Sequence, residues 1–256
     1  MLASQRHTQI SALLKSQGAI TVSDLTARFS VSVETVRRDL LTMENEGLLR
    51  RVHGGAVPVT EMMTYQPLEQ RNLSQSSQKD ALARTAAKLV SDGDYIAIGT
   101  GSTPMHFAQE LKRQLHRLTV VTYSLDVFQI LKDVPGFQLI LVGGQFVPEE
   151  NAFTGQLPLD TLDKLHVQKA FVFPSAISLA HGIWGYEQTL YPLQQKLLQC
   201  CDQAYILADS SKFERTALFK VADARPEYIY VSDPELPEPL KALYEDNGLH
   251  IITERG

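Results

Sequence analysis

The sequence of 256 residues contains only two cysteines, Cys200 and Cys201, and they are adjacent. Neighbours in a helix do not face each other, so the pair cannot form a disulfide framework. No second Cys pair or His cluster at metal-ligand spacing accompanies them. No apolar run approaches the roughly 20 residues that a membrane-spanning helix needs, and the first residues carry no hydrophobic signal region. We therefore expect buried cysteines, no metal or cofactor, no membrane partner and a cytoplasmic location.

The chain also lacks net positive charge, because 24 Lys and Arg face 29 Asp and Glu, for a net charge of −5. The charges are unevenly distributed. Residues 1–58 hold seven Lys and Arg against five Asp and Glu, whereas the rest of the chain is acidic. A basic excess confined to one segment is typical of a single nucleic-acid-binding module. With 44% hydrophobic residues in a chain of this length, we expect a small domain and a second one of ordinary size.

A stretch beginning at Ser32 is predicted to form a helix that reads DNA. Ser32 is a suitable N-cap, and Gly47 stands where the helix should stop. Between them an apolar stripe recurs at helical spacing, formed by Val33, Val36, Leu40 and Met43. The N-cap and the remaining faces supply the predicted DNA contacts Ser32, Glu34, Thr35, Arg37, Arg38 and Thr42.

Two helices are predicted upstream, over 4–17 and from the capping pattern of Thr21 and Asp24 onward. Helix, short turn and helix form the helix-turn-helix arrangement, whose second helix enters the major groove. β-type residues around a Gly-Gly turn then predict a two-stranded wing over 48–57. We expect its arginines and histidine to reach the sugar-phosphate backbone, and the predicted wing contacts are Arg50, Arg51, His53, Gly54 and Gly55.

These stretches resemble the N-terminal signature of the DeoR-type bacterial transcriptional regulators. The similar residues are Arg6 with Ile10 and Leu14, followed by 31–40 and 47–56. The resemblance implies a winged helix-turn-helix domain over 1–58 and sequence-specific binding to double-stranded operator DNA. It further implies a repressor of carbohydrate-metabolism genes that a phosphorylated sugar or related metabolite releases. Because a two-fold protein reads two half-sites, we expect a homodimer or homotetramer.

Residues 59–78 are polar and poorly periodic, so we predict a linker there. From 79 to 256, nearly continuous apolar strands alternate with helical patterns, which indicates an α/β domain with a mostly parallel sheet covered on both faces. The expected strands are 95–98, 118–122, 137–142, 169–173, 205–208, 228–231 and 250–252. The expected helices are 80–91, 104–115, 125–133, 190–201 and 237–247.

Ligands of such sheets bind at the carboxyl ends of the strands, where this sequence places polar residues. The loop from Gly99 to Thr103 leads into a helix with Pro104 near its start, so free N–H groups can cradle a phosphate. The loop is neither a dinucleotide fingerprint nor a nucleotide P-loop, which favours a ribose or phosphosugar ligand over NAD or ATP. Lys212 could supply a point charge. The predicted effector contacts are Gly99, Thr100, Gly101, Ser102, Thr103, Thr122, Tyr123, Ser124, Gly143, Gly144, Asp209 and Lys212.

This second half is similar to the family's effector domain, which resembles sugar-phosphate isomerases and binds phosphorylated sugars or related metabolites. Tyr123 stands where the family has Asn, and Pro174 lies in a segment where the family has a Gly-Ala…Gly-Ile loop. Both residues are expected to narrow or reshape the pocket, which leaves open an unusual effector or a repressor without one.

The competing interpretation is a sugar-phosphate isomerase with an appended DNA-binding module. Such an enzyme needs a carboxylate base near the phosphate loop. The segment 174–178, which corresponds by resemblance to an acidic catalytic loop, contains no acid, and the remaining candidate bases are Glu149, Glu150, Glu187 and Asp209. We therefore predict a regulator rather than an enzyme.

Overall fold

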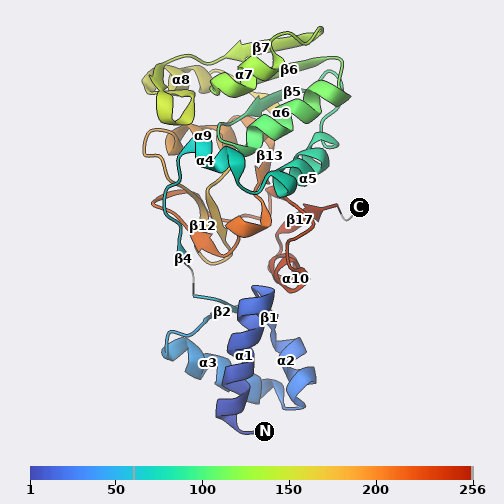
Figure 1. The fold of residues 1–256 in the computed structure, drawn as a ribbon, viewed down its shortest axis with the longest axis vertical. Helices are drawn as coiled ribbons and strands as arrows, with labels where there is room; N and C mark the ends of the chain where they lie inside the picture. Colours follow the sequence, from blue (N-terminus) through green and yellow to red (C-terminus); the bar gives the residue numbers. More distant parts are fainter. Residues whose placement is uncertain (60, 255–256) are drawn as a thin grey trace.

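The computed structural model describes residues 1–59 and 61–254. The predicted linker includes residue 60 and the predicted second domain includes 255 and 256, all outside the described residues. The molecule is elongated, with the N-terminal helices at one end and a large sheet at the other (Figure 1). Within 1–59 and 61–254, no helix is long and apolar enough to cross a membrane.

The N-terminal end is a winged helix-turn-helix. Three helices, α1 (Ala3–Gln17), α2 (Val22–Phe29) and α3 (Val33–Asn45), pack beside a small antiparallel sheet of order β1-β3-β2. Its strands are β1 (Ile20–Thr21), β2 (Arg50–Val52) and β3 (Gly55–Val57). The core contains Ile10, Leu14, Leu25, Phe29, Val36, Leu40 and Met43.

Local signals in the sequence set the helix starts in this region. Thr21 Oγ1 accepts from the backbone N of Asp24 at 3.0 Å, and Ser32 Oγ accepts from that of Thr35 at 3.2 Å, so both predicted N-caps are present. The predicted apolar stripe of α3 was wrong at Val33, which lies in the first turn and is 44% exposed.

The segment predicted as a linker carries elements of its own. β4 (Glu61–Met62) pairs in parallel with β14 (Arg215–Thr216), and α4 (Leu68–Leu73) follows. Helix α5 (Ser76–Ala87) then begins four residues before the predicted start at 80. Polar residues of this segment pair with residues far along the chain, as Arg71 does with Glu150, and local sequence periodicity cannot predict such contacts.

The second half is built on a seven-stranded sheet in which every neighbouring pair is parallel, which confirms the predicted mostly parallel α/β class. Its order is β17-β16-β13-β10-β5-β6-β7. The chain runs outward from β5 to β7 and then resumes on the other side of β5, so the order reverses between β5 and β10. The strands are β5 (Tyr95–Ile98), β6 (Leu118–Thr122), β7 (Phe137–Leu141), β10 (Val167–Val172), β13 (Cys201–Leu207), β16 (Ile229–Ser232) and β17 (His250–Thr253).

Helices cover both faces of this sheet (Figure 1). One layer contains α5, α6 (Thr103–Gln114) and α7 (Leu125–Leu131), which pack on Ile96 and Ile98. The other contains α8 (Gln156–Leu162), α9 (Tyr191–Gln199) and α10 (Glu238–Asp246), which pack in the cluster of Ala97. The helix predicted over 190–201 ends earlier, because Cys201 begins β13; Cys200 is buried and Cys201 is partly buried.

Smaller elements complete the second half. A hairpin of β8 (Gln145–Val147) and β9 (Ala152–Thr154) encloses the 3-10 turn η1 (Pro148–Glu150), and a second 3-10 turn, η2 (Ser210–Lys212), follows β13. A three-stranded sheet has the order β11-β12-β15. Its strands are β11 (Ala176–Ser178), β12 (Gly182–Gly185) and β15 (Phe219–Ala222).

The two halves touch through this small sheet and α10, which lie between the N-terminal helices and the large sheet (Figure 1). Arg50 of β2 hydrogen-bonds His181 in the turn between β11 and β12. Asn247 Nδ2, just after α10, donates to the carbonyl of His53 at 3.1 Å. Ala19 and Val57 belong to the same buried cluster as residues of α10.

Candidate DNA-binding surface and effector pocket

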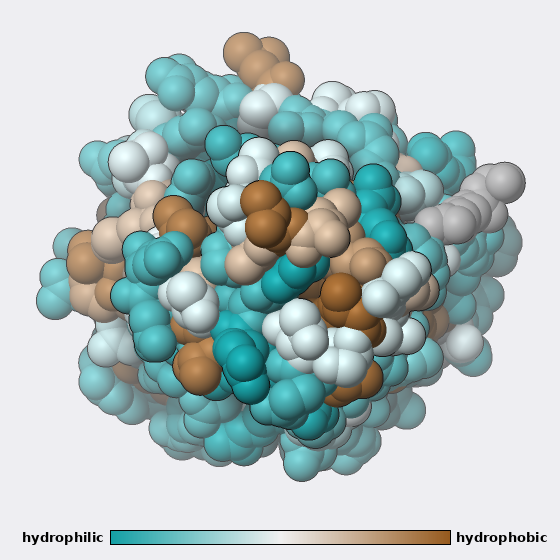
Figure 2. Space-filling model, turned by 90° about the horizontal axis from the view of Figure 1, so that it is seen from below, coloured by the Kyte–Doolittle hydropathy of each residue, from teal (hydrophilic) through white to brown (hydrophobic). Residues whose placement is uncertain are grey.

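The exposed side of α3 carries the predicted reading residues. Glu34, Arg37, Arg38 and Thr42 are all exposed, and Thr35 is partly exposed with its hydroxyl 2.9 Å from that of Ser32. The Thr42 hydroxyl donates to the carbonyl of Arg38 at 3.0 Å. Seen from this end, the surface is mostly hydrophilic with scattered hydrophobic side chains (Figure 2).

A hollow of about 450 Å³ separates α3 from the wing. It is lined by Arg37 from the helix and by Arg51, His53, Gly54 and Gly55 from the wing. The fold thus brings Arg37 of α3 and Arg51 and His53 of the wing, which were predicted separately as DNA contacts, to one surface. A module that binds a DNA groove requires such a surface.

Two wing arginines also make contacts within the protein, although Arg51 remains exposed. Arg51 donates to Glu44 through its backbone N and its Nε, each at 2.8 Å, and these bonds hold the pKa of the Glu44 carboxyl below its ordinary value. Arg50 is partly buried against His181 of the second half. Burial, with the nearby charges of Arg50 and Lys220, lowers the pKa of His181.

Gly55 has a structural part in the wing. A Cβ built there would lie 2.1 Å from the carbonyl oxygen of Ile20, so only glycine allows β3 to approach β1 this closely. Gly54 has φ +84° with open space around it, which suits the tight turn.

A buried ion pair, missed by the sequence analysis, holds α1 against α3. Arg6 Nε and Nη2 donate to the two carboxylate oxygens of Asp39 at 2.6 and 3.0 Å. Burial raises the pKa of Asp39, but the bonds from Arg6 and His7 more than offset it, so the net shift is downward. This bidentate geometry fixes the angle at which α3 is presented.

In the second half, a pocket of about 300 Å³ opens where the strand order reverses. The loop after β5 contributes Gly101, Ser102 and Thr103, and the segment after β10 contributes Pro174 and Ser175. Four cationic side chains line the pocket, and Asp209 is the one lining carboxylate in the described part of the chain. The four are Arg71, Lys79, Lys212 and Arg215.

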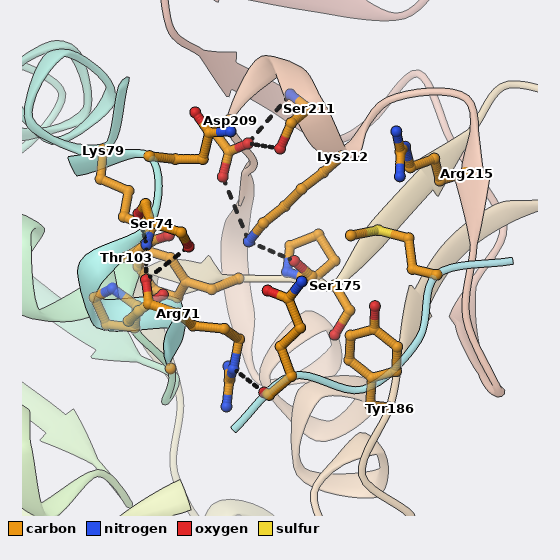
Figure 3. A pocket seen from close by; sticks show the side chains of 18 residues that line it. Arg71, Ser74, Lys79, Thr103, Ser175, Tyr186, Asp209, Ser211, Lys212 and Arg215 are labelled. Atoms are coloured by element: carbon orange, nitrogen blue, oxygen red, sulfur yellow. Dashed lines mark hydrogen bonds and ion pairs between the residues drawn. The ribbon is translucent and has the colours of Figure 1, made fainter. Parts of the chain in front are cut away.

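Figure 3 shows how these cations are held. Lys212 Nζ donates to the carbonyl of Pro174 at 3.1 Å and lies 3.9 Å from Asp209. Lys79 Nζ donates to the carbonyls of Arg71 and Ser74. Burial, with repulsion from Lys212, lowers the pKa of Lys79 to about 8, although Asp209 opposes the shift.

Burial also lowers the pKa of Lys212 despite the attraction of Asp209. Cations this close repel one another, so an anion among them would relieve both the repulsion and the desolvation. The Thr103 and Tyr186 hydroxyl oxygens are buried without a hydrogen-bond partner among residues 1–59 and 61–254, and both residues line the pocket. Together with the N-terminus of α6, this is a chemically suitable setting for a phosphate group.

A second, smaller hollow adjoins the pocket and has acidic walls. Arg71, Phe173, Ser175 and Tyr186 line both cavities. The smaller one adds Glu150 and Glu187. Glu150 accepts from Arg71 and, at 3.3 Å, from the Tyr65 hydroxyl. Burial, with repulsion from Glu150 and Glu149, raises the pKa of Glu187.

The structure brings together only part of the predicted effector set. Gly101, Ser102, Thr103, Asp209 and Lys212 line the larger pocket, and Thr100 lines the smaller one. The predicted residues that line neither cavity are Gly99, Thr122, Tyr123, Ser124, Gly143 and Gly144.

Those residues have other surroundings. Tyr123 is fully buried in the core, so it does not narrow the pocket as expected. Thr122 Oγ1 donates to the carbonyl of Ile98 at 2.8 Å, and Ser124 caps α7. Gly144 packs against the Thr154 carbonyl and Pro158, while Gly143 faces open space beyond the edge strand. Pro174, by contrast, lines the pocket.

Three residues of the pocket, Arg71, Lys79 and Arg215, were not predicted from the sequence. Lys79 had a detectable signal, because it shares a helical face with Leu82, Ala83 and Ala86, all buried in α5. A lysine on an apolar helix face is unusual unless its charge has partners.

Comparisons with known proteins match this arrangement. Residues 6–62 match the DeoR-like helix-turn-helix domain, and residues 74–234 match the DeoR C-terminal sensor domain. The lactose phosphotransferase system repressor of Lactococcus lactis is 35% identical over 216 residues, covering 82% of this chain and 83% of that protein. The L-fucose operon activator of Haemophilus influenzae is 31% identical, covering 92% and 94%.

Among solved structures, ribose 5 phosphate isomerase A from Neisseria gonorrhoeae is 18% identical and covers 55% of this chain and 54% of its own. Its TM-score of 0.41 is too low to indicate a shared ligand or activity.

A winged helix-turn-helix joined to a parallel α/β sensor domain defines a DNA-binding transcriptional regulator rather than an enzyme. The chain belongs to the DeoR family of bacterial transcriptional regulators.

Proposed function

We propose that this regulator represses carbohydrate-metabolism genes and leaves its operator when a phosphorylated sugar, or a related phosphorylated metabolite, binds between β5 and β10. The observation that carries the proposal is the pairing of a cationic pocket with an adjoining acidic hollow. Cations and helix N–H groups suit a phosphate, whereas carboxylates accept hydrogen bonds from sugar hydroxyls. The smaller hollow measures about 30 Å³, so a ligand that spans both cavities would be anionic at one end and place one or two hydroxyl groups at the other.

The names of two relatives support the same class of regulated genes, since one is a lactose phosphotransferase system repressor and another an L-fucose operon activator. In our proposal α3 reads operator bases through Arg37 and Arg38, while Arg51 and His53 contact the backbone. We further propose a homodimer or homotetramer, because two linked modules read two half-sites. Sedimentation velocity of the full chain would test the assembly, and a monomer at micromolar concentration would contradict it.

Lys212→Met tests the ligand site. Thermal-shift titrations would use glucose 6-phosphate, ribose 5-phosphate and inorganic phosphate. Removing one charge that contacts the phosphate should raise the Kd of the binding compound about 10- to 100-fold, as expected for a charge-assisted hydrogen bond. Operator binding should persist, so the variant should no longer release DNA at a ligand concentration that releases the unmodified protein.

The matched control is Lys132→Met, which removes an exposed lysine just after α7 that lies 4.0 Å from Asp133 outside the pocket. It should respond to ligand as the unmodified protein does. If Lys212→Met also releases DNA at the same ligand concentration, Lys212 is not in the effector site.

A further inference from the structure

Glu214 is a buried carboxylate that lies behind the effector pocket. It is 6% exposed and lies two residues after the end of η2. Its neighbours in sequence, Lys212 and Arg215, line the pocket. Its backbone has φ +52°, a left-handed conformation that few non-glycine residues adopt, so the surrounding packing must hold the segment in place.

One hydrogen bond from Glu214 leads to the small sheet. Glu214 Oε1 accepts from the backbone N of Leu179 at 2.9 Å. Leu179 begins the turn that carries His181, and His181 hydrogen-bonds Arg50 of the wing. The position of this carboxylate therefore sets the position of a turn that touches the DNA-binding domain.

A second hydrogen bond to the same oxygen leads to α10. The Tyr244 hydroxyl donates to Glu214 Oε1 at 2.5 Å, and the Tyr244 ring meets Phe213 edge to face, with 5.4 Å between centroids. Leu240 on the same helix lies against Gly18, and Asn247 reaches the carbonyl of His53. Glu214 thus bonds to both the turn between β11 and β12 and helix α10, the two elements through which the second half touches the DNA-binding domain.

The other carboxylate oxygen, Oε2, is buried and has no hydrogen-bond partner within the described part of the chain. An unpaired buried oxygen is costly, so this arrangement gains less free energy than a fully satisfied carboxylate would. A small displacement of 212–215 can therefore weaken the bonds of Glu214 to Leu179 and Tyr244 at modest cost.

We propose that Glu214 is the positioning residue that couples the effector pocket to the DNA-binding domain, acting through Leu179 on the wing contact and through Tyr244 on α10. An anion that draws Lys212 and Arg215 together moves Glu214, and the two elements bonded to it move with it. This coupling rests on the proposed effector site, but the mechanical link between Glu214 and the wing can be tested without any ligand.

The ligand-free test compares Tyr244→Phe with Tyr230→Phe by hydrogen–deuterium exchange of the full chain. Tyr230 is also fully buried, but its hydroxyl bonds the backbone of Arg225 instead. Loss of one hydrogen bond should speed amide exchange about three- to tenfold in 176–182 and in 50–57 for Tyr244→Phe alone. An increase confined to α10, or an equal increase in Tyr230→Phe, would overturn the proposal.

Conservative and disruptive changes at position 214 give an independent readout should Tyr244→Phe fold poorly. Glu214→Gln keeps an oxygen that can accept from Leu179 and Tyr244, so exchange in 50–57 should stay near that of the unmodified protein. Glu214→Leu has no acceptor and should speed exchange there. Equal behaviour of the two variants in 50–57 would contradict the proposal.

The ligand arm uses the phosphate compounds named above. In the unmodified protein, a binding compound should slow exchange in 210–216 and change it in 50–57. In Glu214→Leu, which lacks the acceptor for both Leu179 and Tyr244, only the first effect should remain. If the change in 50–57 persists in Glu214→Leu, Glu214 does not carry the coupling. If no compound affects 210–216 in the unmodified protein, the proposed effector site fails, whereas the ligand-free comparison still decides the role of Glu214.

Discussion

Gly55→Ala should damage the wing because the added methyl group has no space. Its Cβ would lie 2.1 Å from the Ile20 carbonyl oxygen and 3.1 Å from the Thr21 Cα. An ordinary contact needs roughly 3.4 Å, so β1 and β3 must separate by about an ångström, and their pairing consists of only two residue pairs. Overpacking of this kind costs about 1–3 kcal/mol, and weakened ladder hydrogen bonds add about 0.5–1.5 kcal/mol. We expect a local loss of about 2–3 kcal/mol.

The matched control is Gly143→Ala, since Gly143 is exposed with nothing within 4 Å of an added Cβ. It should change stability by less than about 0.5 kcal/mol. Native-state hydrogen exchange of the amides in β1, α2 and α3 measures the local free energy without assuming one global transition. If Gly55→Ala matches the control in exchange yet binds operator more weakly, Gly55 contacts DNA and the packing argument fails.

Two further outcomes follow from the charged residues. Arg38→Ala should weaken operator binding in gel shifts by about 1–3 kcal/mol if Arg38 contacts a base. The control Lys15→Ala, on the exposed side of α1, should leave operator affinity unchanged. Equal affinity of Arg38→Ala and the unmodified protein would show that α3 is not the helix that reads DNA. Lys79 has a pKa of about 8 against an ordinary 10.5, so its stability penalty is complete below pH 8 and disappears by pH 10.5. The free energy of unfolding should therefore rise from pH 8 to pH 10.5, while phosphate affinity falls by at most tenfold per pH unit. Lys79→Met should flatten both pH profiles. Flat profiles in the unmodified protein would show that Lys79 does not have a lowered pKa in the pocket.

Much of the DNA-binding end could be predicted because its signals are local. The caps at Thr21 and Ser32 and the spacing of Val36, Leu40 and Met43 act within a few residues of the chain. The strands of the large sheet were also predictable, since both faces of the sheet are covered and the strands are rich in apolar residues. The isomerase alternative was wrong, because the chain belongs to a family of transcriptional regulators.

The candidate effector pocket was predicted only in part because its walls come from distant segments. A position at the end of a strand does not determine whether its side chain points toward the pocket or into the core. Tyr123 is buried in the core although it follows β6 directly. Gly143 follows β7, an edge strand two places from the reversal of strand order, so it lies too far along the sheet to share the pocket. Arg71 joins the site by folding back to Glu150, a contact 79 residues away in sequence.

The connecting segment has a consequence for how this regulator can be divided. Met63, Gln66, Arg71 and Ser74 all line the pocket, although they precede the start of the sensor domain as judged from sequence at residue 79. A fragment that begins at residue 79 would retain the whole sheet but lack the first residues of α5 and one wall of the cavity. The stretch that joins α3 to the second half thus also forms part of the candidate effector pocket, so we expect a cut there to impair both the proposed ligand binding and the proposed link to the DNA-binding domain.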